Sequence, residues 1–211
     1  MTLPSPAPDL DRLLDGYRRF RADVWPTERA RYERLAEGGQ RPQTLVVACS
    51  DSRVDPQTVF GAAPGEMFVV RNVAGLVPPF HPDAGYHGTS AALEFAVRVL
   101  EVNRIVVLGH AQCGGVRAMV EGAPEMARDF VEPWMAMAEP VLRRIPKGIE
   151  GADILSYCEA EVVRLSLANL ATFPWIAEGV DAGRLTLHGF RFDIRTGMLT
   201  RLEGDDFVPV V

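Results

Sequence analysis

The sequence predicts an α/β fold in which a central, mostly parallel β-sheet is flanked by helices. Short apolar, β-branched runs that suit buried strands alternate with stretches of helical periodicity; these runs lie at 44–48, 67–70 and 105–109. Because a strand–helix–strand order favours parallel pairing with a right-handed crossover, we expect them in one sheet. Near the C-terminus, residues 184–194 and 198–202 alternate apolar and polar side chains around an Arg-Thr-Gly turn, which predicts an antiparallel hairpin at the sheet edge.

The N-terminal region is expected to form a helical arm. Residues 1–8 contain three prolines and should be loose, whereas apolar residues recur at three- and four-residue steps from Leu10 to Val24. Trp25-Pro26 should break this first helix. Thr27 can then cap a second helix that Gly38-Gly39 end. The apolar stripe of the arm must cover a surface, either its own sheet or a partner subunit.

Further helices are expected between and after the strands. Each has a capping residue, a helical pattern or both, and they lie at 55–60, from Thr89 or Ser90 to 100, and at 114–121, 125–144, 152–170 and after Pro174. Residues 76–88 are rich in proline and glycine and should form a loop over the site. We predict one domain over 1–211, divided into an arm (1–38), a core holding the site (40–120), a helical region (121–180) and a hairpin (184–203).

Composition excludes several classes of function. The chain has 211 residues, 47% hydrophobic and 24% charged, with a net charge of -6, which is ordinary for a soluble globular protein. Its pI near 5.3 argues against a general affinity for nucleic acid or anionic membrane. The N-terminus lacks the basic start and apolar core of a signal peptide, and no apolar run approaches the ~18 residues that span a bilayer. We therefore expect a cytoplasmic protein.

Two of the three cysteines stand where strands are predicted to end. Cys49 follows the first strand, and His110 and Cys113 follow the strand at 105–109 within a glycine-rich turn. In a reducing compartment such cysteines are metal ligands or catalytic thiols, whereas Cys158 lies in a helical pattern and is expected to be a buried apolar thiol. Zinc suits cysteine and histidine, and three protein ligands leave a position open for catalysis.

Asp51 and Arg53 are the nearest residues that can assist such a metal. A carboxylate held by a guanidinium stays ionised, so Asp51 can accept a hydrogen bond from zinc-bound hydroxide and orient its oxygen. Two alternatives remain: Asp51 can coordinate zinc itself, or the pair can merely stiffen the loop. Zinc with two thiolates and one neutral imidazole carries no net charge, so its water should ionise at a higher pH than in a three-histidine site.

Four motifs resemble those of the β class of carbonic anhydrases. They are CSDSR at 49–53, RNVAG at 71–75, GTSAALEFAV at 88–97 and GHAQCGG at 109–115. The resemblance runs from about Gln40 to Val120, LHGFRFD at 187–193 also fits, and the region 121–180 matches only in kind.

The resemblance implies an enzyme that reversibly hydrates carbon dioxide to bicarbonate and a proton. It implies Zn²⁺ on Cys49, His110 and Cys113, and Asp51 and Arg53 as the catalytic dyad. In the implied substrate pocket, Gln40 is the hydrogen-bond donor. The apolar wall consists of Phe68, Val73 and Phe95, and the backbone of Gly114 lies beside it. Family members place this site at a dimer interface wrapped by N-terminal helices, so a homodimer or a dimer of dimers is expected.

The same residues are compatible with two other functions and exclude a third. The same scaffold could hydrolyse carbon disulfide or carbonyl sulfide, or zinc could stabilise a binding module without catalysis. A cysteine phosphatase fails because Cys-x-x-x-Arg is too short for a phosphate loop. One subgroup of the family has a tryptophan three residues before the first cysteine, as part of an inhibitory bicarbonate site. Here that position is Val46, and Gln40 is present as in the other subgroup, so Asp51 should stay off the metal at working pH. His81 or His87 could shuttle protons, whereas His188 is expected to be structural.

Overall fold

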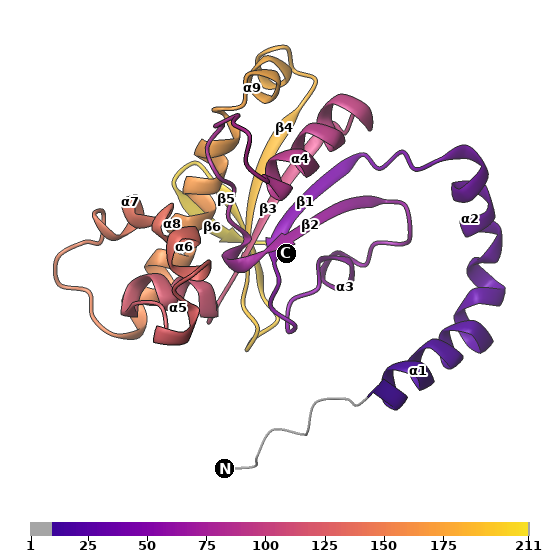
Figure 1. The fold of residues 1–211 in the computed structure, drawn as a ribbon, viewed down its shortest axis with the longest axis horizontal. Helices are drawn as coiled ribbons and strands as arrows, with labels where there is room; N and C mark the ends of the chain where they lie inside the picture. Colours follow the sequence, from indigo (N-terminus) through magenta and orange to yellow (C-terminus); the bar gives the residue numbers. More distant parts are fainter. Residues whose placement is uncertain (1–9, 211) are drawn as a thin grey trace. The chain divides into compact units, whose positions relative to one another are not determined.

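The computed structural model describes residues 10–210 (Figure 1). Contacts within the chain divide it into two compact units, and the boundary in the sequence lies between Gln40 and Arg41. The predicted loose arm at 1–8 lies outside the described residues. None of the helices in residues 10–210 is both long and apolar enough to cross a bilayer.

The N-terminal unit is helical from Leu10 to Gly38. Helix α1 (Leu10–Arg19) continues through a π-helical turn, η1 (Phe20–Val24), into α2 (Trp25–Gly38). The predicted break at Trp25-Pro26 is therefore wrong: Pro26 lies in the first turn of α2, where a missing N–H costs little. Thr27 does not cap this helix, because its hydroxyl donates to the Val24 carbonyl (2.8 Å). The predicted end at Gly38 is confirmed, and Gly39 follows with φ 72°.

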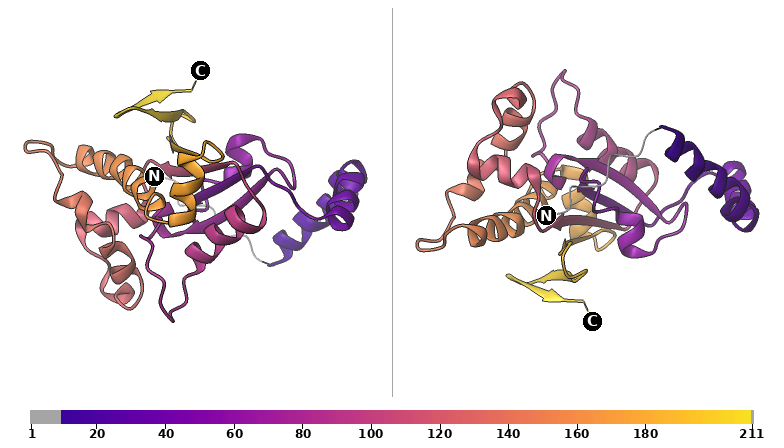
Figure 2. Two further views of the ribbon diagram at one scale, coloured as in Figure 1. Left: turned by 90° about the horizontal axis from the view of Figure 1, so that it is seen from above. Right: turned by 90° about the horizontal axis from the view of Figure 1, so that it is seen from below.

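The second unit is built on one six-stranded sheet in the order β2-β1-β3-β4-β5-β6. Its strands are β1 (Thr44–Cys49), β2 (Met67–Asn72), β3 (Arg104–His110), β4 (Thr186–Phe192), β5 (Leu199–Glu203) and β6 (Asp206–Pro209). The first four pair in parallel, and β5 and β6 pair antiparallel. Figure 2 shows these two C-terminal strands, in yellow, at the margin of the sheet. The predicted α/β fold is confirmed, and β6 is a strand that the sequence pattern missed.

The helices of this unit follow the predicted order with two corrections. They are α3 (Pro56–Phe60), η2 (Val73–Gly75), α4 (Gly88–Glu94), η3 (Phe95–Val99), α5 (Gly114–Glu121), η4 (Glu125–Ala127), α6 (Val131–Ala136), α7 (Glu139–Leu142), α8 (Ala152–Leu170) and α9 (Pro174–Asp181). The segment predicted at 125–144 is divided into three short pieces, and Pro140 lies in the first turn of the last one. Neither Thr89 nor Ser90 caps α4, because the cap position is His87 and Thr89 instead accepts from the Asn72 amide (3.1 Å).

The core is divided by the sheet and extends past the ends of its strands. Leu45 and Val47 face α4, α8 and α9, whereas Val46 and Ala48 face α3. A third apolar cluster includes Cys49 and Cys113 and packs against α5 to α8. The strand ends that carry the predicted site are thus enclosed by helices.

Candidate active site

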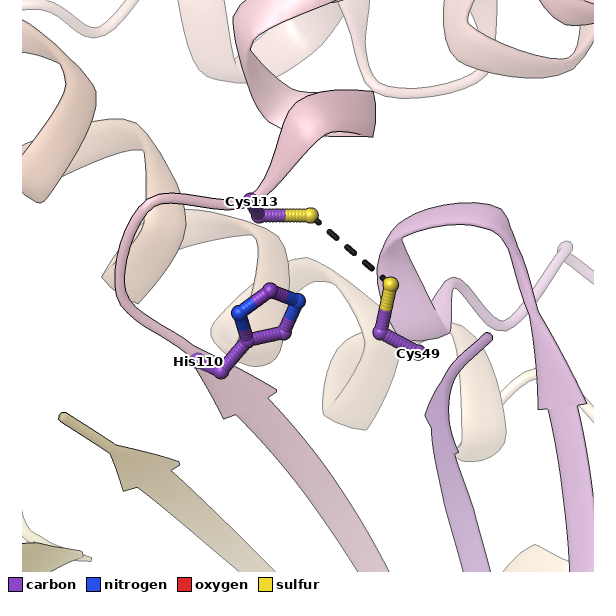
Figure 3. A group of neighbouring side chains, drawn as sticks. All are labelled: Cys49, His110 and Cys113. Atoms are coloured by element: carbon purple, nitrogen blue, oxygen red, sulfur yellow. Dashed lines mark hydrogen bonds between the residues drawn. The ribbon is translucent and has the colours of Figure 1, made fainter. Parts of the chain in front are cut away.

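The three predicted metal ligands converge where β1 and β3 end. Cys49 is the last residue of β1, His110 is the last residue of β3, and Cys113 immediately precedes α5. Their ligand atoms all lie within 4.8 Å of one another, and the two Sγ atoms are 3.9 Å apart. Figure 3 shows the three side chains gathered at the ends of their elements, with the contact between the two sulfurs dashed. All three residues are buried, at 6%, 2% and 3% exposure. In residues 10–210 this is the only such group of histidine, cysteine and acidic side chains.

The donor set fits a zinc ion. Two Zn–S bonds of ≈ 2.3 Å at a tetrahedral angle separate the sulfurs by about 3.8 Å. His110 Nδ1 lies 2.8 Å from the Ala111 carbonyl, a contact that makes Nδ1 the donor and leaves a lone pair on Nε2. That Nε2 is buried and has no hydrogen-bond partner. A buried polar atom normally has a partner, so an unpaired nitrogen beside two thiols fits the role of a metal ligand.

The turn from His110 to Cys113 is held by three different elements. The Ala111 N–H donates to the Phe192 carbonyl of β4 (2.9 Å), and the Gln112 carbonyl accepts from Arg53 Nη2 (3.0 Å). The Cys113 N–H donates to Glu159 Oε1 of α8 (3.2 Å). Gln112 has φ 58°, a conformation that costs free energy for a residue with a Cβ and persists only where its surroundings enforce it.

Asp51 and Arg53 form a bidentate ion pair next to the three ligands. Arg53 Nε and Nη2 donate to the two carboxylate oxygens at 2.9 and 2.7 Å, and the Arg53 N–H also donates to Oδ1 (2.9 Å). These bonds from Arg53 hold the pKa of Asp51 well below its ordinary value, although burial opposes the shift. Asp51 Oδ2 lies 3.9 Å from His110 Nε2, so the carboxylate borders the place where a metal would bind.

Arg71 fixes the loop that carries this pair. Its Nε donates to the Cys49 carbonyl (2.9 Å), and its Nη2 donates to the carbonyls of Asp51 (2.7 Å) and Val54 (2.8 Å). Arg71 begins the RNVAG motif, but this role was not predicted from the sequence. A signal was present, because an arginine near the end of a neighbouring parallel strand can reach the loop after β1.

The pKa values of the two thiols are shifted in opposite directions. The hydrogen bond between the sulfurs lowers the pKa of Cys49 and raises the pKa of Cys113, and burial disfavours ionisation of both. Two thiolates 3.9 Å apart repel each other strongly in this buried place. A divalent cation between them removes the repulsion, and its binding would release the remaining proton.

The structure brings some of the predicted substrate residues to the ligands and places others elsewhere. Val73 lies against the first turn of α5, where a Cβ on Gly115 would be 2.8 Å from Val73 Cγ1, and Gly114 begins the same turn. Phe68 and Phe95 form a separate pair, with ring centroids 5.8 Å apart. Phe68 is in register with Leu45, four residues before Cys49, which corresponds to about 13 Å along the strand. Gln40 belongs to the N-terminal unit, and its role stays a prediction.

The histidines among the remaining candidates contact residues other than the three ligands. His87 Nε2 is 2.6 Å and His81 Nε2 is 3.7 Å from the Asp83 carboxylate, all in the loop before α4. His188 contacts the Thr186 hydroxyl (2.9 Å), and Cys158 is fully buried in α8. A proton-shuttle role for either loop histidine stays a prediction.

Comparison with known proteins agrees with this geometry. A family model described as carbonic anhydrase matches residues 44–199. The carbonic anhydrase of Pseudomonas aeruginosa is 39% identical over 195 residues, covering 91% of this chain and 87% of the relative. The carbonic anhydrase of Synechocystis sp. is 33% identical over 205 residues, covering 94% of this chain and 74% of the relative.

Solved structures give the class. The β-carbonic anhydrase CcaA superposes with a TM-score of 0.89 at 33% identity, covering 96% of this chain and 92% of that one. A tetrameric β-carbonic anhydrase from Sordaria macrospora gives a TM-score of 0.78 at 28% identity, covering 91% and 95%. The predicted family and the prediction of an enzyme are thereby confirmed: the chain belongs to the carbonic anhydrases, in their β class.

Proposed function

We propose that this chain catalyses the zinc-dependent, reversible hydration of carbon dioxide to bicarbonate and a proton. The observation that carries the proposal is the buried Cys49, His110 and Cys113 cluster, whose unpartnered His110 Nε2 lies 3.9 Å from the Asp51 carboxylate. A purely structural zinc site closes its fourth position with another protein ligand. Here the neighbouring side chain is a carboxylate that Arg53 already holds.

Each residue has a distinct part in this proposal. Cys49, His110 and Cys113 would hold the zinc ion, which supplies a Lewis acid that makes water nucleophilic near neutral pH. The depressed pKa of Asp51 makes it a poor proton acceptor but a constant hydrogen-bond acceptor. We therefore assign it the orientation of the attacking oxygen rather than its deprotonation. Arg53 fixes the carboxylate and, through the Gln112 carbonyl, ties it to the turn that carries Cys113.

The reaction itself is the first test. We expect purified protein to contain about one zinc per chain and stopped-flow hydration of carbon dioxide to accelerate from about pH 6.5 to about 9, because two thiolates weaken the polarisation of water by the metal. Removing zinc with a chelator should abolish hydration, and adding zinc back should restore it. Bound zinc without hydration would instead favour a zinc-stabilised binding module, and faster turnover of carbon disulfide would identify that compound as the substrate.

We also propose that the apolar wall is completed by a second subunit. Phe68 lies about 13 Å along the strand from the metal ligands of its own chain, and its ring partner Phe95 is 43% exposed. An aromatic pair that lies away from its own site, with one ring exposed, can line the site of a partner in a symmetric dimer. This supports a homodimer in which each site takes its ligands from one chain and its aromatic wall from the other.

Hybrid dimers can test this arrangement. Co-expressing an Asp51→Ala chain with a Phe68→Ala/Phe95→Ala chain, each with its own affinity tag, allows hybrids to be isolated. If the wall acts in trans, each hybrid contains one intact site and should recover about half of the wild-type activity. Both parent homodimers should be impaired. Hybrids no more active than two impaired parents would show that the wall acts within its own chain, and an unimpaired Phe68→Ala/Phe95→Ala homodimer would place the aromatic pair outside the substrate pocket.

A further inference from the structure

We propose that Glu159 is a positioning residue of the metal centre, acting through the backbone N–H of Cys113; this rests on the proposed zinc site. Glu159 lies on α8 and is only 4% exposed, which is rare for a glutamate without a dedicated partner. Its Oε1 accepts from the Cys113 N–H at 3.2 Å, and its Oε2 accepts from Arg191 Nη2 at 2.6 Å. One carboxylate thus links a ligand-bearing backbone to a neighbouring strand.

Arg191 holds this carboxylate in place. It lies on β4 in register with Gly109, the residue before His110, and its Nη2 also contacts Ser156 Oγ (3.1 Å). Gly109 allows α8 to approach, because a Cβ there would lie 2.5 Å from Val163 Cγ2. The Glu159 side chain therefore extends from α8 to the β3–β4 pair and is bonded at both carboxylate oxygens. The oxygen that accepts from Cys113 has little conformational freedom.

The consequence falls on the turn between two ligands. The N–H of Cys113 stands just before the first turn of α5, where helix geometry supplies no partner for such groups. The Phe192 carbonyl and Arg53 hold the two preceding residues, and Glu159 holds the N–H of Cys113. Because Gln112 is in a costly left-handed conformation, losing this bond lets the turn relax. Cys113 Sγ would then move relative to Cys49 and His110.

Metal readouts separate positioning from general stability. We expect Glu159→Ala to speed release of Co²⁺ or Zn²⁺ to a chelator by about 10- to 100-fold, the usual effect of removing a partner behind a ligand. The sulfur-to-cobalt absorption bands of the Co²⁺ protein should change as well. Glu159→Gln keeps an oxygen for Cys113 but loses the ion pair, so its release rate should fall between those of Glu159→Ala and the wild type.

Glu161→Ala is the matched control. Glu161 lies two residues further along α8 and pairs with Arg164 at 2.6 Å, with a side chain 12% exposed, but it has no bond to the ligand turn. We expect this variant to lose an ion pair of similar geometry while its release rate and cobalt spectrum remain those of the wild type.

The outcomes are decisive even if one variant is lost. Metal release and cobalt bands in Glu159→Ala that match Glu161→Ala would overturn the proposal; should Glu159→Ala not fold, the same match in Glu159→Gln would overturn it. Normal cobalt binding by a wild-type protein that hydrates no carbon dioxide would refute the proposed function alone. The positioning role of Glu159 would then still be measured by metal release.

Discussion

Replacing Asp51 by alanine is expected to lower kcat/KM for carbon dioxide hydration by about 10²- to 10³-fold, the range typical for removing one preorganised hydrogen-bond partner, while zinc content stays at the wild-type level. The carboxylate borders the metal position at 3.9 Å from His110 Nε2 but belongs to the Arg53 pair rather than to the ligand set. Its removal therefore takes away the acceptor that orients the attacking oxygen and leaves all three ligands. Stopped-flow kinetics together with elemental analysis measure both quantities.

Asp55→Ala is the control for a change in the same loop. Asp55 caps α3 by accepting from the Thr58 N–H (2.9 Å), so its loss should cost about 1 kcal/mol of stability with hydration intact. Asp51→Asn keeps the shape of the side chain without its charge and should be impaired like Asp51→Ala. If Asp51→Ala retained full activity, the ion pair would only stiffen the loop, as one of the sequence interpretations allowed.

The pH dependence of stability gives a second measurement on Asp51. Arg53 depresses the folded-state pKa of this carboxyl, so the pair stabilises the fold above the unfolded-state pKa of about 3.9 and loses that contribution as pH falls toward the folded-state value. Asp51→Ala should therefore be less stable than the wild type at neutral pH, with the difference shrinking in acid. Since Asp51 stays ionised throughout the range of the kinetic assay, the rise of activity with pH must come from another group.

The sequence was sufficient to predict the group of Cys49, His110 and Cys113 because its geometry follows from strand pairing. Cys49 and His110 end two parallel neighbours, and parallel strands bring their carboxyl ends to one edge of a sheet. Cys113 follows within one turn. The Asp51–Arg53 pair is equally local, because the two residues are two positions apart in one tight loop.

Contacts between distant elements could not be predicted in the same way. Glu159 shows as an interruption of the apolar pattern of α8, but periodicity does not say that it meets Arg191 and the Cys113 backbone. Phe68 is similar: its place in β2 was clear, whereas its distance from the ligands depended on register. The helix through Trp25-Pro26 was missed because a π-helical turn absorbs the irregularity before the proline.

His110→Ala should have the largest effect, because it removes the only nitrogen donor of the cluster and leaves two thiols whose proximity disfavours double ionisation. We expect the purified variant to lose its zinc, and hydration to fall at least about 10³-fold, to the level of chelator-treated wild type. Added zinc should restore the treated wild type and not the variant. His188→Ala tests whether losing any sheet histidine has this effect: His188 contacts Thr186 rather than a sulfur, so zinc and activity should be kept. A His110→Ala protein that retained one zinc per chain would show that the ion binds elsewhere, and the unpaired Nε2 would then need another explanation.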